Sequence, residues 1–340
     1  MSIEVSVIMP VYNGGETLNQ AIKSVLNQSF KDIELILIDD GSTDESLVVC
    51  NAYKEKDSRV TVIHQENMGI CGTRNKGIEM ACGKYIAFID DDDVYDEKLI
   101  EMNYLLLEKY DGDMIKYGSD CAVTINGKRT SNNSDMKTLH ILNNDEEKKE
   151  AFIQLFKSHL LVYVWDMIVK KELIREKNIC FDTYFKHGHE DILFAMECVY
   201  NAKTIIVNPY TYYCHIVGEK TTSGGFFRDQ IDATNYLIKK EHKIFTMMNI
   251  KNEYWQEVLA VRLLYLCQYM SHHKSDMKFI DIYKEIRNFS LNNQCKFIIY
   301  FRFKGLKELM KSVMLFLYNH NKIGTMVVCI KAKKLIINRW

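Results

Sequence analysis

The sequence predicts an α/β fold with a doubly wound, mostly parallel sheet, followed by a helical C-terminal region. Continuous apolar runs alternate with segments whose apolar residues recur at helical spacing, and polar or acidic residues close the runs. Only two prolines occur in 340 residues, and 47% hydrophobic with 26% charged residues is ordinary for a globular chain. We therefore expect ordered structure nearly throughout.

The first four apolar runs are predicted strands separated by helices. The strands cover residues 4–13, 33–42, 59–65 and 83–93. Residues 14–30 and 43–56 are predicted helices, and residues 69–82 are a loop that leads into a helix. Because the runs are nearly unbroken, both faces of the sheet are expected to be buried. Ligands bind beyond the carboxyl ends of the strands in such a sheet, so those ends are the expected place for a site.

Acidic residues gather at these strand ends. Residues 39–41 include two aspartates, and residues 90–93 are four consecutive aspartates directly after an apolar run. Adjacent carboxylates raise one another's pKa unless a cation compensates them. Hard oxygen ligands favour Mg²⁺ or Mn²⁺, which bind through one or two carboxylates and take phosphate oxygens elsewhere. The pattern indicates a metal-bridged phosphate ligand, with a solvated acidic turn as the alternative.

The C-terminal region, residues 226–340, is predicted to be mainly helical. Its clearest helix covers residues 253–270, with one apolar face made by Trp255, Val258, Leu259, Leu263 and Leu266. Residues 291–340 contain ten Lys or Arg and one acid, Glu308, in a chain whose net charge is -1. Since apolar residues are interleaved with this charge, we expect helices on an anionic membrane surface; packing against the rest of the chain is the alternative.

Missing patterns argue against several protein classes. The ten cysteines form no CxxC pair, which disfavours a zinc site or disulfide framework and favours reduced thiols in the cytosol. We see no secretory signal and no run of 18 apolar residues. The first strand is followed by PVYNGG rather than the GxGxxG of a dehydrogenase or the glycine-rich basic loop of a nucleotidyltransferase. No nucleic-acid recognition motif accompanies the basic region.

Four ordered motifs carry a resemblance to a known family: PVYN, IDDGSTD, ENMGICGTRNKGI and FIDDDD. Together they resemble the nucleotide-sugar-binding half of family 2 inverting glycosyltransferases with the GT-A fold. The match covers residues 4–120. It implies a GT-A catalytic domain over residues 1–225, in which residues 1–120 bind the nucleotide sugar and residues 121–225 form the acceptor side.

The resemblance implies roles in donor binding for residues at the first two strand ends. Pro10, Val11 and Tyr12 would line the nucleotide-base pocket. Asp40 would hydrogen-bond uracil or its counterpart, and Asp39 is the less certain member of that pair.

The third and fourth motifs imply contacts to the rest of the donor. Asn67 and Gly69 match the NxG element of the family, and Arg74 matches an arginine near the nucleotide and phosphates. Asp90 and Asp92 fit the DxD motif, the first facing the ribose and the second the metal.

Two aspartates of the FIDDDD motif depart from the common pattern. Asp91 stands where the family commonly has a small polar residue between the two acids. The metal ligand therefore stays open between Asp92 and Asp93. The implied cofactor is Mn²⁺ or Mg²⁺, which would stabilise the leaving diphosphate as a Lewis acid.

A candidate base lies far along the chain, in KHGHEDILFAMECVY. Glu190 and Asp191 precede apolar residues at helical spacing, so they are predicted to start a helix. Acids in a first turn also stabilise a helix without any catalytic role. By resemblance, Asp191 matches the base of an ED motif, and Glu190 would support it or bind the acceptor. His187 and His189 are the local rivals for the proton.

Two further segments resemble acceptor and diphosphate elements. Trp165 matches an aromatic residue that borders the acceptor site, with a buried core tryptophan as the alternative. His215 follows paired tyrosines, where a basic residue approaches the diphosphate; it would bind phosphate or metal unless it is structural. Residues 221–225, all Thr, Ser or Gly, would suit a mobile lid over the donor.

These observations predict a metal-dependent enzyme, a glycosyltransferase of the hexosyltransferase class. Its donor would be a nucleotide sugar, with UDP the favoured nucleotide, and its acceptor a saccharide hydroxyl, lipid-linked, in surface polysaccharide assembly. The basic C-terminal region places it as a peripheral protein at the cytosolic face of the plasma membrane. The alternative is a catalytically inert nucleotide-binding scaffold in a membrane assembly.

Overall fold

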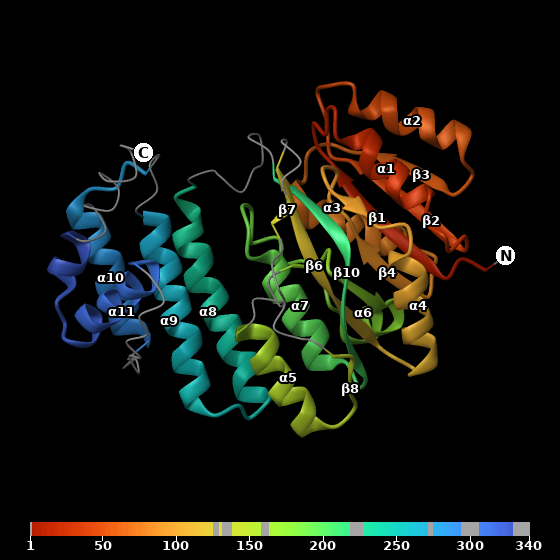
Figure 1. Cartoon of the computed structure of the whole chain (residues 1–340). Coiled ribbons are helices and arrows are strands. Elements are labelled where there is room, and N and C mark those ends of the chain that lie inside the picture. The colour runs from red at the N-terminus through yellow and green to blue at the C-terminus, as the bar shows by residue number, and fades with distance from the viewer. Residues whose placement is uncertain are drawn as a thin grey trace. The chain divides into compact units, whose positions relative to one another are not determined.

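The computed structural model describes residues 2–124, 129–130, 138–157, 163–217, 227–270, 275–293 and 306–328. The chain forms two compact units, residues 1–221 and 222–340 (Figure 1). The first unit holds the sheet, and the second is helical in its described part. Every site residue predicted above lies in the first unit.

The parallel part of the sheet follows the predicted strands. It consists of β1 (Val5–Val11), β2 (Ile33–Asp39), β3 (Val60–His64) and β4 (Tyr85–Phe88), in the order β3-β2-β1-β4. All of these pairings are parallel. Every residue of β1, β2 and β4 is buried. The unbroken apolar runs thus form strands that are covered on both faces, as predicted.

The connecting helices cover this sheet. They are α1 (Leu18–Leu26), α2 (Ser46–Lys56) and α3 (Gly69–Met80), and α3 packs on β1 and β2. Close approach of α3 depends on Gly77, because a Cβ there would lie 2.4 Å from the side chain of Ile8. The helix that carries the third motif is therefore held tightly against the centre of the sheet.

The rest of the sheet is mixed. Next to β4 come β9 (Met167–Lys170), β6 (Met114–Thr124), β10 (Ile205–Val217) and the short β5 (Val94–Tyr95). β9 is antiparallel to both β4 and β6, β6 is parallel to β10, and β5 is antiparallel to β10. The sequence did not predict these antiparallel strands. They bring β10 beside the segment that follows β4.

The remaining elements of the first unit border this mixed part. The short strands β7 (Arg129–Thr130) and β8 (His140–Leu142) pair with β6 and β10. The helices are α4 (Leu99–Lys109), α5 (Asp145–Lys157), α6 (Lys171–Lys177) and α7 (Glu190–Asn201). α4 packs on β6 and β10, and α6 packs on β9 and α7.

The second unit contains α8 (Asp229–Met247), α9 (Asn252–Met270), α10 (Phe279–Asn293) and α11 (Leu306–Asn319). The helix predicted at residues 253–270 is confirmed as α9, and all five residues of its predicted apolar face are buried. Glu241 of α8 and Arg262 of α9 form a buried, two-pronged ion pair. Such a pair fixes how α8 and α9 align.

The basic C-terminal region is partly folded into this unit. Met314, Tyr318, Met326 and Val327 are buried, and the Tyr318 ring packs edge-on against Phe289 of α10. Among the described residues of this region, these four side chains follow the packing alternative, whereas Phe316 and Val328 are exposed. Residues 294–305 and 329–340, which carry most of its charge, lie outside the described residues. Among the described helices, none has both the length and the apolar character needed to cross a bilayer.

Candidate functional site

The three predicted strand ends meet at one edge of the sheet. Val11 at the end of β1 is paired with Asp39 at the end of β2, and Phe88 at the end of β4 is paired with Ile8 of β1. The backbone N–H of Asp40 donates to the carbonyl of Val11 over 2.9 Å. The predicted convergence of polar residues at the carboxyl ends is therefore present.

Asp40 organises the loop that leads into α3. Its Oδ1 accepts hydrogen bonds from the Gln65 side chain and the Met68 backbone, both at 2.8 Å, and its Oδ2 accepts from the Gly69 backbone at 2.9 Å. Gly69 has a φ of +74°, a conformation that favours glycine. Both carboxylate oxygens of Asp40 are thus engaged by the protein.

Asp39 differs from its neighbour because one of its oxygens has no partner. Its side chain is fully buried, with Oδ2 lying 2.6 Å from Nδ1 of His64. Its Oδ1 is buried and makes no hydrogen bond. A buried acceptor without a donor is costly, so this atom suits an N–H group of a ligand. Asp39 therefore has an unused acceptor that Asp40 lacks, and its partner His64 was not predicted.

The other predicted nucleotide contacts differ in exposure. Pro10 and Val11 are buried, whereas Tyr12 is 53% exposed at the end of β1. Asn67 is exposed, and its Oδ1 accepts a hydrogen bond of 3.2 Å from the backbone of Gly69. Of these residues, Tyr12 and Asn67 present side chains at the surface.

Arg74 of α3 lies at the centre of the site. Its Nη2 donates to Asp90 Oδ1 over 3.0 Å, and its Nη1 donates to Glu190 Oε1 over 3.3 Å and to Asp191 Oδ1. The Arg74 side chain is only 4% exposed, and its guanidinium lies over the ring of Phe181. One buried cation therefore joins α3, the end of β4 and the start of α7.

Glu190 and Asp191, which we call the helix-start cluster, open α7 as predicted. Burial raises the pKa of Asp191 well above its usual value, while the charge of Arg74 acts to lower it. Glu190 Oε2 is buried without a hydrogen-bond partner. The preceding residue, His189, has a φ of +80°, which is uncommon for a residue with a side chain and fixes the entry into the helix. His187 is exposed.

Asp90 to Asp93, which we call the strand-end cluster, follow β4 with four different environments. Asp90 pairs with Arg74, as described above. Asp91 Oδ2 accepts a hydrogen bond of 3.1 Å from the backbone of Tyr12, and burial raises the pKa of Asp91 to about 7. Asp91 thus braces the end of β1 and is not a small spacer.

Asp92 and Asp93 differ in their availability to a ligand. Asp93 is fully buried, accepting hydrogen bonds from the Tyr213 hydroxyl and the Ile216 backbone and lying 2.9 Å from Nδ1 of His215. Asp92 is half-buried, and burial together with the charges of Asp93 and Asp90 raises the pKa of Asp92 to about 6. The geometry therefore favours Asp92 over Asp93 as the carboxylate that could hold a cation.

His215 is aimed by its contact with Asp93. Because Nδ1 faces that carboxylate, Nε2 is the nitrogen available to a ligand, and the side chain is 39% exposed. The hydrogen bond to Asp93 raises the pKa of His215 above its usual value. Within the described residues, no three His, Cys, Asp or Glu side chains converge on one metal-sized point. A cation here would need phosphate oxygens or water to complete its coordination.

Trp165 lies inside a column of stacked rings. It is 6% exposed, with the ring centroid of Tyr163 at 4.5 Å on one side and that of Tyr213 at 4.3 Å on another. Trp165 therefore occupies a core position, as the alternative reading of the sequence held. Tyr163 is the exposed ring of the column, at 42%, and it was not predicted.

A buried ion pair holds this segment in place. Lys116 of β6 pairs with Asp166, and its Nζ also donates to the carbonyl of Tyr163 over 2.9 Å. Both charged side chains are nearly inaccessible. Burial raises the pKa of Asp166 to about 6, against the opposing charge of Lys116. The residues predicted to form a lid, 221–225, lie outside the described part of the chain.

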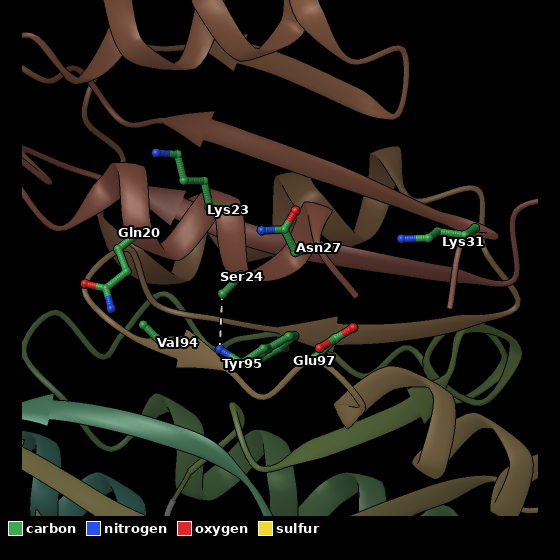
Figure 2. A pocket seen from close by; sticks show the side chains of 8 residues that line it. All are labelled: Gln20, Lys23, Ser24, Asn27, Lys31, Val94, Tyr95 and Glu97. Carbon is green, nitrogen blue, oxygen red and sulfur yellow. Dashed lines mark hydrogen bonds between the residues drawn. The ribbon is translucent and has the colours of Figure 1, made fainter. Parts of the chain in front are cut away.

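A separate polar pocket of about 560 Å³ lies where α1 passes β5 (Figure 2). Lys23, Asn27 and Glu97 line it, and the backbone of Tyr95 donates to Ser24 Oγ across its floor over 3.1 Å. None of the predicted site residues lines this pocket. This pocket is therefore separate from the candidate site.

Comparison with known sequences agrees with the motifs. A family model described as Glycosyl transferase family 2 matches residues 6–164. The poly(ribitol-phosphate) beta-N-acetylglucosaminyltransferase TarP of Staphylococcus aureus is 31% identical over 307 residues, covering 84% of this chain and 87% of that protein. The cholesterol galactosyltransferase of Borreliella burgdorferi is 34% identical over 230 residues, covering 62% of this chain and 59% of that protein.

Comparison with solved structures shows the same fold. The structure of Staphylococcus aureus TarS 1-349 in complex with UDP-GlcNAc matches with a TM-score of 0.70 at 17% identity, covering 98% of this chain and 92% of that one. The chain spans 38% to 62% of the length of four other curated relatives, including the Borreliella protein. Because the match to TarS covers 98% of this chain, the likeness in fold extends through both compact units.

Proposed function

The chain belongs to glycosyl transferase family 2, and from this premise we propose that it transfers a sugar from a UDP-sugar donor to a saccharide hydroxyl during the synthesis of a bacterial surface glycopolymer. TarS binds UDP-GlcNAc in its solved complex, and TarP is named as an N-acetylglucosaminyltransferase, so a UDP-hexose or UDP-N-acetylhexosamine is the proposed donor. One observation supports this most strongly: Arg74 draws Asp90 at the strand ends and Asp191 at the start of α7 into one site.

We assign the nucleotide to the carboxyl ends of β1 and β2. Asp39 Oδ1 is the buried acceptor without a partner, and uracil offers one imide N–H that could fill it. Tyr12, exposed at the rim, would cover the base. The diphosphate would then extend toward Asp92 and His215, at the end of β4.

In the reaction, the acceptor oxygen attacks the anomeric carbon of the donor sugar. The new C–O bond forms as the bond from that carbon to the diphosphate oxygen breaks, and UDP leaves with the bonding electrons. Asp191 takes the proton of the attacking hydroxyl. A single base suffices for an inverting displacement, so Glu190 is assigned to the acceptor through its unpartnered Oε2.

We propose that the Asp92 carboxylate and Nε2 of His215 are the protein ligands for Mn²⁺ or Mg²⁺. A carboxylate whose pKa is raised by its neighbours gains from a nearby cation, and the Asp93–His215 contact has the arrangement that orients a metal-binding histidine. A bound divalent ion supplies Lewis-acid stabilisation of the departing diphosphate. Asp93 acts by holding His215.

The assay that tests this function measures UDP release from UDP-GlcNAc and UDP-galactose, with and without a saccharide acceptor. We expect slow hydrolysis without acceptor and a faster transfer with it. The Asp191→Asn protein is the matched control, because it keeps the residues that are proposed to bind the donor. Release no greater than that of the control, for any donor, would favour the inert scaffold.

We further propose peripheral binding to an anionic membrane, carried by the charge of residues 329–340 rather than by the apolar face of α11, which is buried in part. Replacing Lys331, Lys333 and Lys334 with Gln should weaken binding to phosphatidylglycerol vesicles by about 1 kcal/mol per lysine. Equivalent changes at three exposed lysines of the first unit, Lys54, Lys56 and Lys98, serve as the control. Equal binding by both triple variants would refute this location.

A further inference from the structure

Arg74 was expected beside the donor phosphates, but its observed contacts point elsewhere. The side chain is 4% exposed, and both terminal nitrogens are committed to carboxylates. Its Nε is buried and makes no hydrogen bond. A guanidinium that served mainly as a phosphate clamp would present its two-pronged face to the ligand. Here that face is turned to Asp90, Glu190 and Asp191.

We infer that Arg74 is a positioning residue, which orients the base Asp191 through one oxygen and ties it to the donor-side Asp90. This inference rests on the proposed function of Asp191. The guanidinium holds Oδ1, so Oδ2 is the oxygen that receives the proton from the acceptor hydroxyl. Because the same cation contacts Asp90, donor contacts and base geometry share one rigid link.

The link depends on a fork that lysine cannot reproduce. Nη2 reaches the end of β4, and Nη1 reaches the first turn of α7, so two nitrogens of one planar group bridge two elements. The ring of Phe181 supports the guanidinium, with 5.3 Å between its central carbon and the ring centroid. Lysine would keep the charge but offer a single nitrogen.

The electrostatic consequence follows from the groups that act on Asp191. From α3 come Arg74 and the buried thiol of Cys71, from the end of β4 comes Asp90, and from the segment before β9 comes Tyr163. Glu190 acts from its own helix. Burial and the two neighbouring carboxylates raise the pKa of Asp191. Among these groups, the positively charged Arg74 is the one that lowers the pKa of Asp191. Without Arg74, the base would hold its proton to higher pH.

The experiment compares the pH dependence of kcat for the wild type, Arg74→Met and Arg74→Lys. In the wild type, kcat should fall at low pH as Asp191 becomes protonated. An opposite charge at contact lowers a carboxylate pKa by about 1–3 units, so Arg74→Met should move this acidic limb upward by about that amount. Arg74→Lys should move it less, yet lower the plateau kcat because the base is no longer oriented.

Asp90→Asn is the matched control because it should move the limb in the opposite direction. Removing the Asp90 charge takes away one influence that raises the pKa of Asp191, so the acidic limb should move to lower pH. A merely structural role for Arg74 would lower activity in both variants without these opposite shifts. Affinity for UDP, measured by calorimetry, should change less than tenfold in Arg74→Lys.

Two outcomes would overturn the inference. One is an acidic limb that stays in place in a folded Arg74→Met protein. The other is a loss of UDP affinity above tenfold in Arg74→Lys with an unchanged plateau kcat, which would make Arg74 a phosphate ligand. If Arg74→Met does not fold, Arg74→Lys carries the test through its plateau kcat, and an unchanged plateau in that variant would overturn the inference. A ¹³C NMR titration of the Asp191 carboxyl, assigned with Asp191→Asn, gives the same comparison without turnover. Absence of wild-type transfer would contradict the proposed function alone, since the titration still tests Arg74.

Discussion

The strand-end cluster and the helix-start cluster are both runs of adjacent acids, but the protein compensates them differently. Glu190 and Asp191 share a buried guanidinium from α3. In the strand-end cluster, Asp90 uses that same guanidinium and Asp93 is paired with His215. Asp92 is left with a raised pKa and, among the described residues, makes no ion pair. A cation supplied by the protein suits a base that is always present, whereas a cation that arrives with the ligand suits a site that must fill and empty.

The largest expected effect separates the two clusters by function. Asp191→Asn removes the proton acceptor but leaves the strand ends unchanged, so kcat for transfer should fall by about 10²–10⁴. Calorimetry should find UDP affinity within about twofold of the wild type. A variant that loses UDP binding as well would merge the two clusters into one binding site.

The next effect tests the structural member of the strand-end cluster. Asp93→Asn disturbs hydrogen bonds to Tyr213, His215 and the Ile216 backbone in a fully buried position. We expect the free energy of unfolding to drop by about 1–3 kcal/mol in urea titrations. If stability is unchanged and only metal-dependent binding is lost, then Asp93 rather than Asp92 is the ligand.

Asp92→Asn should give the converse result. Its side chain is half-buried and has no role as a structural partner in the contacts described above, so unfolding should change by less than about 0.5 kcal/mol. Affinity for UDP in Mn²⁺ should weaken by about tenfold or more, which corresponds to about 1.4 kcal/mol. Affinity in EDTA should stay the same, and a drop there too would indicate a direct contact with the nucleotide.

The smallest kinetic effect concerns the aromatic column of Tyr163, Trp165 and Tyr213. Tyr163→Leu removes its exposed ring and should raise the acceptor KM by about two- to tenfold with little change in stability. Trp165→Leu removes a buried ring and should instead lower the free energy of unfolding by about 2–4 kcal/mol. The reverse pattern in steady-state kinetics and urea titrations would restore Trp165 as the acceptor contact.

Sequence periodicity and motif order predicted the parallel strands, the strand-end edge and the start of α7, because each depends on local patterns. The environment of each aspartate depended on distant partners. Asp93 is buried because the antiparallel pairing of β5 with β10 places Tyr213 and His215 against it. A strand of two residues, Val94–Tyr95, carries no periodic signal that could have predicted this.

The partners of Arg74 were likewise beyond the reach of the sequence. Arg74 and Asp191 are separated by more than a hundred positions. They meet because the fold brings the first turn of α7 close to α3 and to the residues that follow β4. Asp39 and His64 are the last residues of β2 and β3 and lie opposite each other in the register of these strands. Aligning the ends of the two predicted strands could therefore have identified His64 as the neighbour of Asp39. Tyr163 could not be distinguished from Trp165 by pattern, because the two aromatic residues alternate along one short segment.

The most direct test of the central claim is a calorimetric titration of the wild-type protein with UDP, once with Mn²⁺ and once with EDTA. The claim is that the strand-end cluster takes its counter-charge from a ligand-borne cation. It predicts UDP binding that is at least about tenfold tighter with Mn²⁺. Equal affinity with Mn²⁺ and with EDTA would contradict it, and the four aspartates would then have to be compensated by the protein itself.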